Sequence, residues 1–548
     1  MDKVRKSINK IINEYLDQEI ETIFTRPEPE FGDLSTNIAL QLAKKLNKNP
    51  KQIANDLAEL LSKELSGIIL KVSVAGPGFI NIVLVDDILL DQLRADVPAT
   101  DRSEQVVIIE TNNPNPFKAM HVGHAYNSIM SDTIANLIEN SGKQVHRVSY
   151  HGDVGTHVGK SMYSLLKYVD GNPDKLNDIK PSERNSFMSK MYSDGAKAYN
   201  NDEYTKNKIV ELAKQSFTRD DPIYQQVYEM CKQWSFDQID DILKRIGSKP
   251  VERKFLESEA NDEGVAIVKA NVPDVFTESD GALVFQGSKH GSFDNVFVSK
   301  QGIGLYGARD LGLIKLKDQY CHPQKSYIVT AEEQRDYFKG VIAAAELCMP
   351  RFKDITVNIP TGMVKLSTGK MSSRTGDVVE ISWLFDQIAA AIVDRGGTPN
   401  DLFIAGVLRY QFLKVRVGGD VIFDINEAVS IEGNSGPYLQ YAHARASSIL
   451  SKANNIPSSI SNIETSERML VVKLTEYQDV ILRSTNELLP HLICTYLYEL
   501  SQEFNRFYEK NRVIGDSRQN QRLFLVRKYA NTLKNGLHLL GIFAPDKM

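Results

Sequence analysis

The chain has 548 residues, of which 42% are hydrophobic and 25% charged, and 65 basic residues face 70 acidic ones for a net charge of −5. This length predicts about three or four domains with cores of their own, and the average composition excludes a disordered, collagen-like or coiled-coil protein. The longest apolar runs are too short to span a membrane, and the N-terminus lacks the features of a signal peptide. Four scattered cysteines fit neither a zinc site nor a disulfide framework, so we expect a cytoplasmic protein with no membrane contact and no metal ligands of its own.

Residues 1–98 are expected to form a separate α+β domain. Helical periodicity is followed by two strand-like segments around a Gly-Pro-Gly turn, at 4–16, 38–46, 69–74 and 79–84. The segment 96–102 has the composition of a linker, and the character of the chain changes after it.

Residues 104–390 are expected to form an α/β core around a parallel sheet, because short β-branched runs alternate with helical patterns. The first unit has strands at Gln105–Thr111 and Val145–Tyr150, with a helix at about Val122–Asn140 between them. A polar, mainly helical insertion is expected at about 161–290. Further strands are expected at Asn295–Ser299, Ser326–Thr330 and Ile355–Val357. The helical pattern of residues 391–548 predicts an all-α C-terminal part.

The most informative segment is the loop and helix start between Glu110 and His124. A strand ends, an Asn/Pro-rich loop follows, and a helix begins at His121-Val-Gly123-His124. The two histidines lie on one face of the first turn, beside backbone N–H groups that favour phosphate. Gly123 leaves the backbone uncovered, so that a flat base could lie against it. The segment predicts a nucleotide site, although capping or core histidines would explain the same residues.

A second loop, Lys365–Val379, carries the cations Lys365, Lys370 and Arg374 between glycines or beside them. Glycine-flanked Lys/Ser loops can close on an anion, with lysine as a point charge and arginine as a fork. A solvated surface turn would have the same composition. The presence of a first phosphate-type loop in the same chain favours the anion-binding interpretation.

Together, His121-Val-Gly-His124 and Lys370-Met-Ser-Ser-Arg374 resemble the two signature motifs of class I aminoacyl-tRNA synthetases. The surrounding sequence resembles arginyl-tRNA synthetases in particular, at 31–37, 78–81, 115–124, 151–155, 280–283, 433–445 and 534–548. The resemblance implies a Rossmann-like catalytic core, an N-terminal α+β domain and a C-terminal helical bundle. It also implies ATP-dependent attachment of L-arginine to tRNA(Arg) through an arginyl-adenylate, with Mg2+ accompanying the ATP, and we expect a monomer.

The resemblance gives roles to the residues of both loops. The catalytic residues that it implies, which would stabilise charge on the departing pyrophosphate, are Lys118, His121, His124, Lys370 and Arg374. The ATP contacts that it implies are His121, Gly123, His124, Met363, Val364, Lys370 and Met371. Ser373 stands where the class motif has a second lysine, and Lys118 is expected to take over the role of that cation.

An arginine substrate needs a planar acceptor for its guanidinium and an anion to offset its charge. Tyr306 and Asp310 are spaced i and i+4 on one helix face, and the resemblance assigns the guanidinium to them. An ordinary helix-start pair would have the same spacing. The other arginine contacts that the resemblance implies are Glu110, Asn115, His124 and Gln334, with Glu333 as the alternative to Gln334.

A rival interpretation comes from Gly302-Ile-Gly304-Leu-Tyr306-Gly307, a GxGxxG that follows one expected strand and precedes a helix. Glu332 comes after the next strand, so the segment approaches the dinucleotide-binding fingerprint and would indicate an NAD-dependent oxidoreductase. The ring of Tyr306 would crowd a pyrophosphate there. The rival also leaves the two basic loops unexplained.

The C-terminal helices interleave basic and aromatic residues, a pattern suited to stacking unpaired bases and following a nucleic-acid backbone. The same aromatic residues would also serve as the core of a helical bundle. The resemblance assigns this bundle to the anticodon and the N-terminal domain to the tRNA elbow. The tRNA contacts expected from it are Asn81, Tyr508, Lys510 and Arg527. A non-catalytic tRNA-binding protein is a further alternative, and two intact phosphate loops argue against it.

Overall fold

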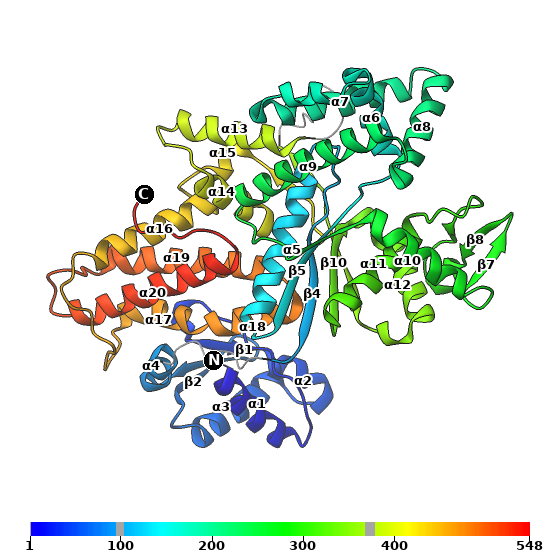
Figure 1. Ribbon diagram of the computed structural model, residues 1–548. Coiled ribbons are helices and arrows are strands. Elements are labelled where there is room, and N and C mark those ends of the chain that lie inside the picture. Colours follow the sequence, from blue (N-terminus) through cyan, green and yellow to red (C-terminus); the bar gives the residue numbers. More distant parts are fainter. Residues whose placement is uncertain (1, 95–102, 368–378) are drawn as a thin grey trace.

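The computed structural model describes residues 2–94, 103–367 and 379–548, and Figure 1 shows how its parts are arranged. The whole of the expected linker at 96–102, and Lys370, Met371 and Arg374 of the second loop, lie outside the described residues. Along the chain, an N-terminal α+β domain is followed by a parallel-sheet core and then by a helical C-terminal part. This architecture confirms the predicted fold class.

The N-terminal domain combines an antiparallel sheet with helices that cover it. The strands are β1 (Leu34–Thr36), β2 (Ile69–Ala75) and β3 (Phe79–Leu84), and β3 lies between the other two. The helices are α1 (Asp2–Leu16), α2 (Ile38–Leu46), α3 (Pro50–Glu64) and α4 (Asp86–Arg94). Ile8, Leu57 and Ile82 are fully buried where the helices meet the sheet, so the domain has an apolar centre of its own.

A parallel sheet forms the centre of the core. Its strands are β4 (Val106–Asn112), β5 (Gln144–His151), β6 (Arg253–Leu256), β10 (Lys325–Ala331) and β11 (Thr356–Thr361). Within the described residues these five strands have the order β11-β10-β4-β5-β6. The order reverses between β4 and β10, where the loops leaving the carboxyl ends diverge and open a crevice. The predicted loop at 110–124 follows β4 at this point.

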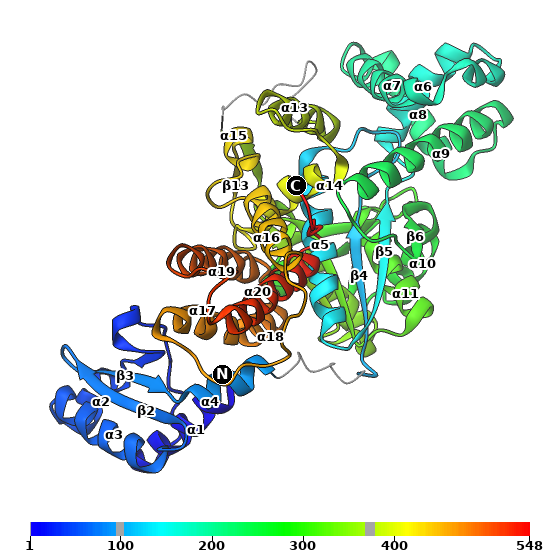
Figure 2. The same ribbon diagram turned by 90° about the vertical axis from the view of Figure 1, so that its left-hand side faces the viewer.

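Helices cover both faces of this sheet. Strand alternation sends Ile109 of β4 toward α5 (Val122–Asn140) and Ile108 toward α10 (Glu257–Ala270) and α11 (Tyr306–Cys321). Figure 2 shows α5 on one side of the strands and α10 and α11 on the other. Because both faces are buried, β4 is a continuous apolar run in the sequence, which is why it was predictable.

The segment expected to be an insertion differs from the prediction in its second half. It begins as a helical bundle formed by α6 (Thr156–Val169), α7 (Arg184–Tyr199), α8 (Glu203–Thr218) and α9 (Pro222–Arg245). After this bundle, β6 returns to the central sheet beside β5, and its four residues with two leading basic side chains carry too little apolar signal to be recognised. A separate antiparallel sheet follows, formed by β7 (Phe276–Ser279), β8 (Ala282–Phe285) and β9 (Asn295–Val298). The strand predicted at 295–299 therefore exists but does not join the central sheet.

The C-terminal part is mainly helical, as predicted, but it is not all-α, because the short strand β13 (Val421–Phe423) pairs in parallel with β12 (Val364–Leu366). After α12 (Arg335–Cys348) of the core, its helices are α13 (Ile381–Asp394), α14 (Asp401–Leu413), α15 (Ile425–Ala428), α16 (Gly436–Leu450), α17 (Thr465–Thr475), α18 (Tyr477–Glu487), α19 (His491–Lys510) and α20 (Gln519–Leu539). Phe504 stacks on Tyr529 with ring centroids 3.8 Å apart, so these aromatic residues belong to the bundle core. Within the described residues, no helix is both long and apolar enough to cross a membrane.

A buried ion pair joins the core to the C-terminal helices. Arg409 of α14 donates to Asp132 of α5 at 2.5 Å, and both side chains are fully buried. The same guanidinium donates to the carbonyl oxygens of Ile246, after α9, and Leu540, after α20, at 2.9 and 2.7 Å. One side chain thus holds four elements together, and removing one partner of such a pair costs about 3–5 kcal/mol.

The N-terminal domain lies against the C-terminal helices, below α17 and α18 in Figure 1. Arg468 of α17 donates to both carboxylate oxygens of Asp33, at 3.1 and 2.6 Å, and to Asp86 at 2.5 Å. Arg26 adds ion pairs to Glu476 and Glu503 at 3.8 Å each. Charged side chains therefore connect the first domain to the helical part, at the opposite end of the molecule from α6–α8.

Candidate active site

The start of α5 holds two histidines in a reciprocal cap. His121 Nδ1 accepts the backbone N–H of His124 at 3.2 Å, and His124 Nδ1 accepts the backbone N–H of His121 at 3.3 Å. The rings stack with centroids 3.5 Å apart. Because each Nδ1 accepts a hydrogen bond, the proton of each neutral ring resides on Nε2. The histidines do cap the helix, and the cap itself orients two Nε2–H donors.

Both rings are neutral near pH 7. Burial, followed by the charge of Lys118, lowers the pKa of His121 to about 4. Burial, His121 and Lys118 together lower the pKa of His124 well below its usual value. Desolvation and the nearby Lys160 lower the pKa of Lys118, whose side chain still reaches solvent. The helix start thus presents neutral donors, backbone N–H groups and one lysine, a set suited to phosphate oxygens.

Gly123 makes room for the stacked histidines. A Cβ built on this glycine would lie 3.1 Å from Cε1 and Nδ1 of His121. A side chain at this position would therefore press on the ring of His121, and glycine leaves the stacked pair undisturbed. Contact of a nucleotide base with Gly123 stays a prediction.

The second basic loop is anchored beside this helix start. Directly after residues 368–378, the carbonyl of Val379 accepts the N–H of Val122 at 2.9 Å, and the N–H of Ile381 donates to Met120 at 3.2 Å. These bonds belong to an antiparallel bridge at the entrance of α5. The exit of the second loop therefore lies against the first loop, although Lys370, Met371 and Arg374 are outside the described part of the chain.

The entrance of the second loop lies at the same edge of the sheet. Thr361, the last residue of β11, donates its hydroxyl to Asn127 of α5 at 2.6 Å. Met363 and Val364 follow, and the N–H of Met363 donates to Asp420 at 2.9 Å. Met363 is 56% exposed and leaves apolar surface uncovered at this edge of the sheet.

The opposite wall of the crevice is acidic. Glu110, near the end of β4, accepts from Lys317 of α11 at 2.7 Å, and both side chains are 2% exposed. Glu257, at the start of α10, accepts from Arg309 at 2.6 Å, and burial raises the pKa of its carboxyl group. These two carboxylates therefore already have cationic partners.

Asp310 is a third carboxylate in this cluster, and within the described residues it has no cationic partner. The Tyr337 hydroxyl donates a hydrogen bond to it. Burial raises the pKa of Asp310 to about 7. The hydrogen bond from Tyr337 opposes this rise, the charges of Glu110 and Glu257 add to it, and the charge of Lys317, which is not in contact with Asp310, lowers the pKa slightly. A bound cation would relieve the repulsion, so the acidic wall lacks one positive charge.

Asn115 links the two walls. Its Oδ1 accepts the N–H of Gly152 at 2.9 Å, so its amide nitrogen is the end that can donate to a carboxylate. A Cβ on Gly152 would lie 2.9 Å from both Asn115 Oδ1 and Glu257 Oε1. The loop after β4 and the acidic cluster therefore approach each other across this glycine.

The remaining predicted arginine contacts lie nearer the surface. Tyr306 is the first residue of α11, one turn before Asp310, and its side chain is 68% exposed. Gln334 and Glu333 are both exposed on a short helical turn, Glu332–Gln334, that follows β10. All of them lie at the carboxyl edge of the sheet.

Sequence reasoning missed Glu257 as a member of the acidic cluster. An acidic residue that directly follows a strand and begins a helix is a useful signal in an α/β protein. Here the signal was hidden because β6 itself was not recognised. Tyr337 was missed because its role depends on α12 facing α11, which no local pattern reveals.

The Gly302-Gly304-Gly307 segment does not have the geometry of a dinucleotide site. It connects β9 of the antiparallel sheet to α11, whereas the fingerprint requires a parallel strand of the central sheet. A Cβ on Gly307 would lie 2.7 Å from the ring of Phe297, so this glycine permits close contact between helix and strand. The oxidoreductase alternative is not supported.

Two of the four expected tRNA contacts occupy structural positions. Asn81 lies in the middle strand β3 and is 4% exposed, which is unfavourable for direct contact with a nucleic acid. Arg527 donates to carbonyl oxygens of residues 456–457, at 3.3 and 2.5 Å, and so fastens the loop before α17. Lys510 is exposed at the end of α19, and Tyr508 is half-buried.

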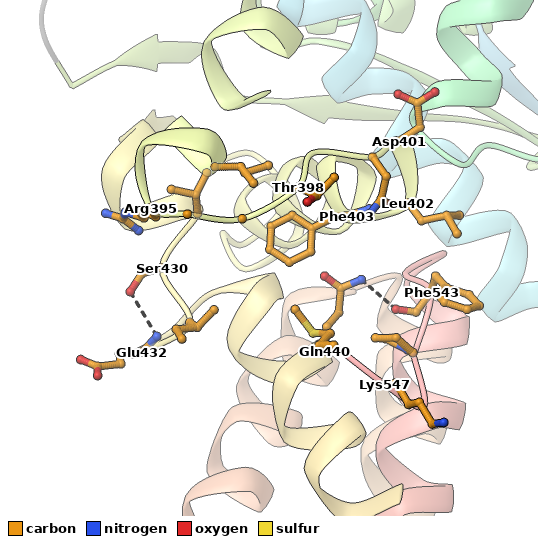
Figure 3. Close-up of a pocket in the computed structure, with 18 residues that line it drawn as sticks. Arg395, Thr398, Asp401, Leu402, Phe403, Ser430, Glu432, Gln440, Phe543 and Lys547 are labelled. Atoms are coloured by element: carbon orange, nitrogen blue, oxygen red, sulfur yellow. Dashed lines mark hydrogen bonds between the residues drawn. The ribbon is translucent and has the colours of Figure 1, made fainter. Parts of the chain in front are cut away.

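A cavity of about 930 Å³ lies elsewhere, between the α13–α14 region, α16 and the C-terminal tail (Figure 3). Phe403, Ile431 and Phe543 contribute to its largely apolar lining, and Gln440 donates to the carbonyl oxygen of Phe543 at 2.9 Å. None of the predicted site residues that the structure describes lines it.

The parallel sheet, with its N-terminal domain and helical C-terminal part, has the fold of a class I aminoacyl-tRNA synthetase, and the histidine-capped start of α5 lies at the switch point of this sheet. The family model "tRNA synthetases class I (R), catalytic domain" matches residues 84–394. The models "Arginyl tRNA synthetase N terminal domain" and "DALR anticodon binding domain" match residues 2–84 and 439–548. The chain belongs to the arginyl-tRNA synthetase family.

Individual relatives agree over nearly the whole chain. An arginine–tRNA ligase of Rippkaea orientalis is 30% identical, over 95% of this chain and 94% of that protein, and one of Shewanella frigidimarina is 29% identical, over 94% and 93%. The arginyl-tRNA synthetases of Thermus thermophilus and Plasmodium falciparum share the fold, with TM-scores of 0.81 and 0.79, 22% and 19% identity, and coverage of 99–100% of each chain. Family membership supports aminoacylation of tRNA(Arg) with arginine, and neither alternative is supported.

Proposed function

We propose that this chain activates L-arginine with ATP and then transfers the arginyl group to the 3′-terminal ribose of tRNA(Arg). In the first step, a carboxylate oxygen of arginine attacks the α-phosphorus, the bond to pyrophosphate breaks, and arginyl-adenylate forms. In the second step, a ribose hydroxyl attacks the carbonyl carbon and AMP leaves. The observation that carries this proposal is Asp310, a carboxylate without a cation, in a crevice whose other wall is the start of α5.

The phosphate wall acts by donating hydrogen bonds. The Nε2–H groups of His121 and His124 and the first N–H groups of α5 donate to phosphate oxygens, and they are already oriented before the substrate arrives. Lys118 supplies a full positive charge as negative charge develops on the pyrophosphate. Lys370 and Arg374 complete this wall from the second loop. The adenosine contacts are Gly123, Met363, Val364 and Met371.

Mg2+ would accompany the ATP and be held by few protein ligands. Within the described residues, no cluster of three or more His, Cys, Asp or Glu side chains is arranged to hold a metal ion. This fits Mg2+, which keeps several waters and binds chiefly through substrate phosphates. When bound, it neutralises part of the triphosphate charge, while the chain's own donors orient the phosphate oxygens.

The acidic wall selects arginine. The guanidinium of arginine supplies the cation that Asp310 lacks. Tyr306 covers the guanidinium from the exposed side, and Glu257 lies beside the guanidinium. Asn115 donates to the substrate carboxylate from the loop that also carries the phosphate donors. The remaining contacts with the amino acid are Glu110, His124 and Gln334.

The C-terminal helices bind the anticodon arm of tRNA(Arg), and the N-terminal domain contacts the elbow. Lys510 follows the phosphate backbone from the end of α19, beside Tyr508. Asn81 and Arg527 contribute to these surfaces indirectly, by stabilising the β3 strand and the loop before α17. The protein works as a monomer in the cytoplasm, where its four free cysteines stay reduced.

A charging assay with total tRNA, ATP and each standard amino acid in turn tests this function. Incorporation of arginine alone is expected, and incorporation of another amino acid would contradict the proposal. Pyrophosphate exchange, measured with and without tRNA, then shows whether the adenylate forms before tRNA binds. Sedimentation velocity tests the monomer.

A further inference from the structure

Tyr150 carries a buried hydroxyl that has no hydrogen-bond partner among the residues described. The residue is next to last in β5, where it pairs with Phe255 of β6, and its N–H donates to Asn113 at 2.9 Å. Neighbouring segments thus fix the backbone, and the residue is partly buried with its hydroxyl oxygen out of contact with solvent. Buried hydroxyl groups without partners are uncommon, because their desolvation is not compensated.

The ring of Tyr150 lies on the sheet face that carries the acidic cluster. It packs with Ile108 of β4 and Leu313 of α11 in one apolar group. Glu110 is two residues after Ile108 and so faces the same way, toward α11, where Lys317 meets it. The charges of Asp310 and Glu257 act on the Tyr150 hydroxyl after burial itself, and together they raise its pKa well above the usual value.

The ligand expected beside this hydroxyl carries many hydrogen-bond donors. A guanidinium presents five N–H groups in one plane. Glu110 and Glu257 already accept from Lys317 and Arg309, and Asp310 already accepts from a tyrosine hydroxyl. A neutral acceptor on the same wall offers a partner for one of these N–H groups and adds no further negative charge to an already crowded group of acids.

We propose that Tyr150 is a specificity-determining residue of the amino-acid site, whose hydroxyl oxygen accepts one N–H of the arginine guanidinium. The proposal rests on the arginine-activating function above and adds a contact that the motifs of the two loops do not contain. It explains why a polar group stands buried and unpaired in the unliganded protein, because the substrate supplies its partner.

Thermal unfolding of Tyr150→Phe separates this role from a structural one without measuring activity. Removing a hydroxyl that has no partner in the free protein should leave the Tm unchanged or slightly raised. The rise in Tm that saturating arginine produces should be clearly smaller than in the parent protein. A lower Tm without arginine would overturn the proposal, because the hydroxyl would then be serving the fold.

Charging kinetics give the second readout. Loss of one hydrogen bond to a charged group should raise KM for arginine by about tenfold or more, with KM for ATP and for tRNA unchanged. Tyr320→Phe is the matched control, since this exposed hydroxyl donates to Glu252 at 3.2 Å outside the cluster, and it should match the parent. A Tyr150→Phe enzyme with the parental KM for arginine would overturn the proposal.

Two further comparisons keep the outcomes separate. If Tyr150→Leu alone loses affinity for arginine while Tyr150→Phe retains it, the ring matters and the hydroxyl does not, which overturns the proposal. A parent protein that charges no arginine would refute the proposed function itself. A parent that charges arginine normally, with no change in Tyr150→Phe, would refute only the role of Tyr150.

Discussion

The two walls of the crevice handle charge in opposite ways. The phosphate wall uses neutral Nε2–H groups, backbone N–H groups and Lys118, which reaches solvent. The acidic wall uses buried carboxylates. Two of them are paired with buried cations, and among the residues described Asp310 has no cation in contact with it. A multiply charged triphosphate that brings its own cation can be held by dipoles. A single guanidinium needs a full opposite charge that is already in place.

Asp310→Asn should have the largest effect, because it removes the one carboxylate of the acidic wall that has no cation in the described part of the chain. The substitution leaves two acids and two cations on the acidic wall, so the guanidinium would enter a pocket without net negative charge. Because the buried guanidinium of the substrate would lose its charged partner, we expect KM for arginine to rise by about a hundredfold or more. Steady-state charging at saturating ATP and tRNA measures it.

The matched control for this variant is Asp336→Asn. Asp336 is exposed on α12, and its side chain pairs with Lys339 at 2.6 Å rather than with a member of the cluster. We expect the parental KM for arginine in this variant. Equal effects of both substitutions would mean that Asp310 acts through general electrostatics rather than as the partner of the guanidinium.

Lys118→Ala tests the other wall, with a somewhat smaller effect. Removing the cation from the loop at the start of α5 should lower kcat of pyrophosphate exchange by about tenfold to a hundredfold, because transition-state charge loses one stabilising group. The Kd for tRNA should hardly change. Lys160→Ala, on α6 and outside the loop, should lose far less activity, and equal losses of chemistry and tRNA binding in Lys118→Ala would count against its assigned role.

The same contrast explains what the sequence could predict. The phosphate wall is local: Lys118, His121 and His124 lie within seven consecutive residues, and both strand β4 and helix α5 have strong patterns. The acidic wall brings together residues far apart in the chain. Glu257 follows a strand too short to recognise, and nothing around Asp310 indicates that its neighbours already have cations.

Burial was the other quantity that sequence patterns did not provide. Asn81 belongs to a recognisable motif, yet its place in the middle strand buries its side chain. The Gly302–Gly307 segment matches a ligand-binding pattern, yet the strand before it belongs to the wrong sheet. In both cases the tertiary position decided the role, and the local pattern was compatible with either outcome.

Arginine binding should depend on pH through Asp310 of the acidic wall and not through the histidines of the phosphate wall. The pKa of Asp310 is raised to about 7, so the carboxyl group is increasingly protonated as the pH falls through that value. Guanidinium binding requires the ionised form, so KM for arginine should rise by about tenfold from pH 8 to pH 6. His121, with a pKa lowered to about 4, stays neutral across this range and contributes no such change.

The raised pKa of Asp310 also makes the stability of the folded protein depend on pH. Because the pKa of Asp310 in the folded protein lies above that of an exposed aspartate, ionisation near pH 7 destabilises the unliganded fold. The stabilisation by saturating arginine should therefore increase as the pH is raised from 6 to 8. Asp310→Asn should abolish the pH dependence of KM in this range, and a variant that retained it would locate the titrating group elsewhere.

Gly123→Ala should give the smallest effect, and it tests whether the phosphate wall depends on fine geometry. The added Cβ would meet the His121 ring at 3.1 Å, so the ring must move by a few tenths of an ångström and its Nε2–H donor with it. Activity should fall a few-fold, while alanine in the first turn of α5 should leave the Tm unchanged or raise it. Gly67→Ala, where a Cβ meets nothing within 4 Å, should alter neither. Unchanged activity in Gly123→Ala would mean that the phosphate wall tolerates displaced donors, and that preorganisation matters less there than in the acidic cluster.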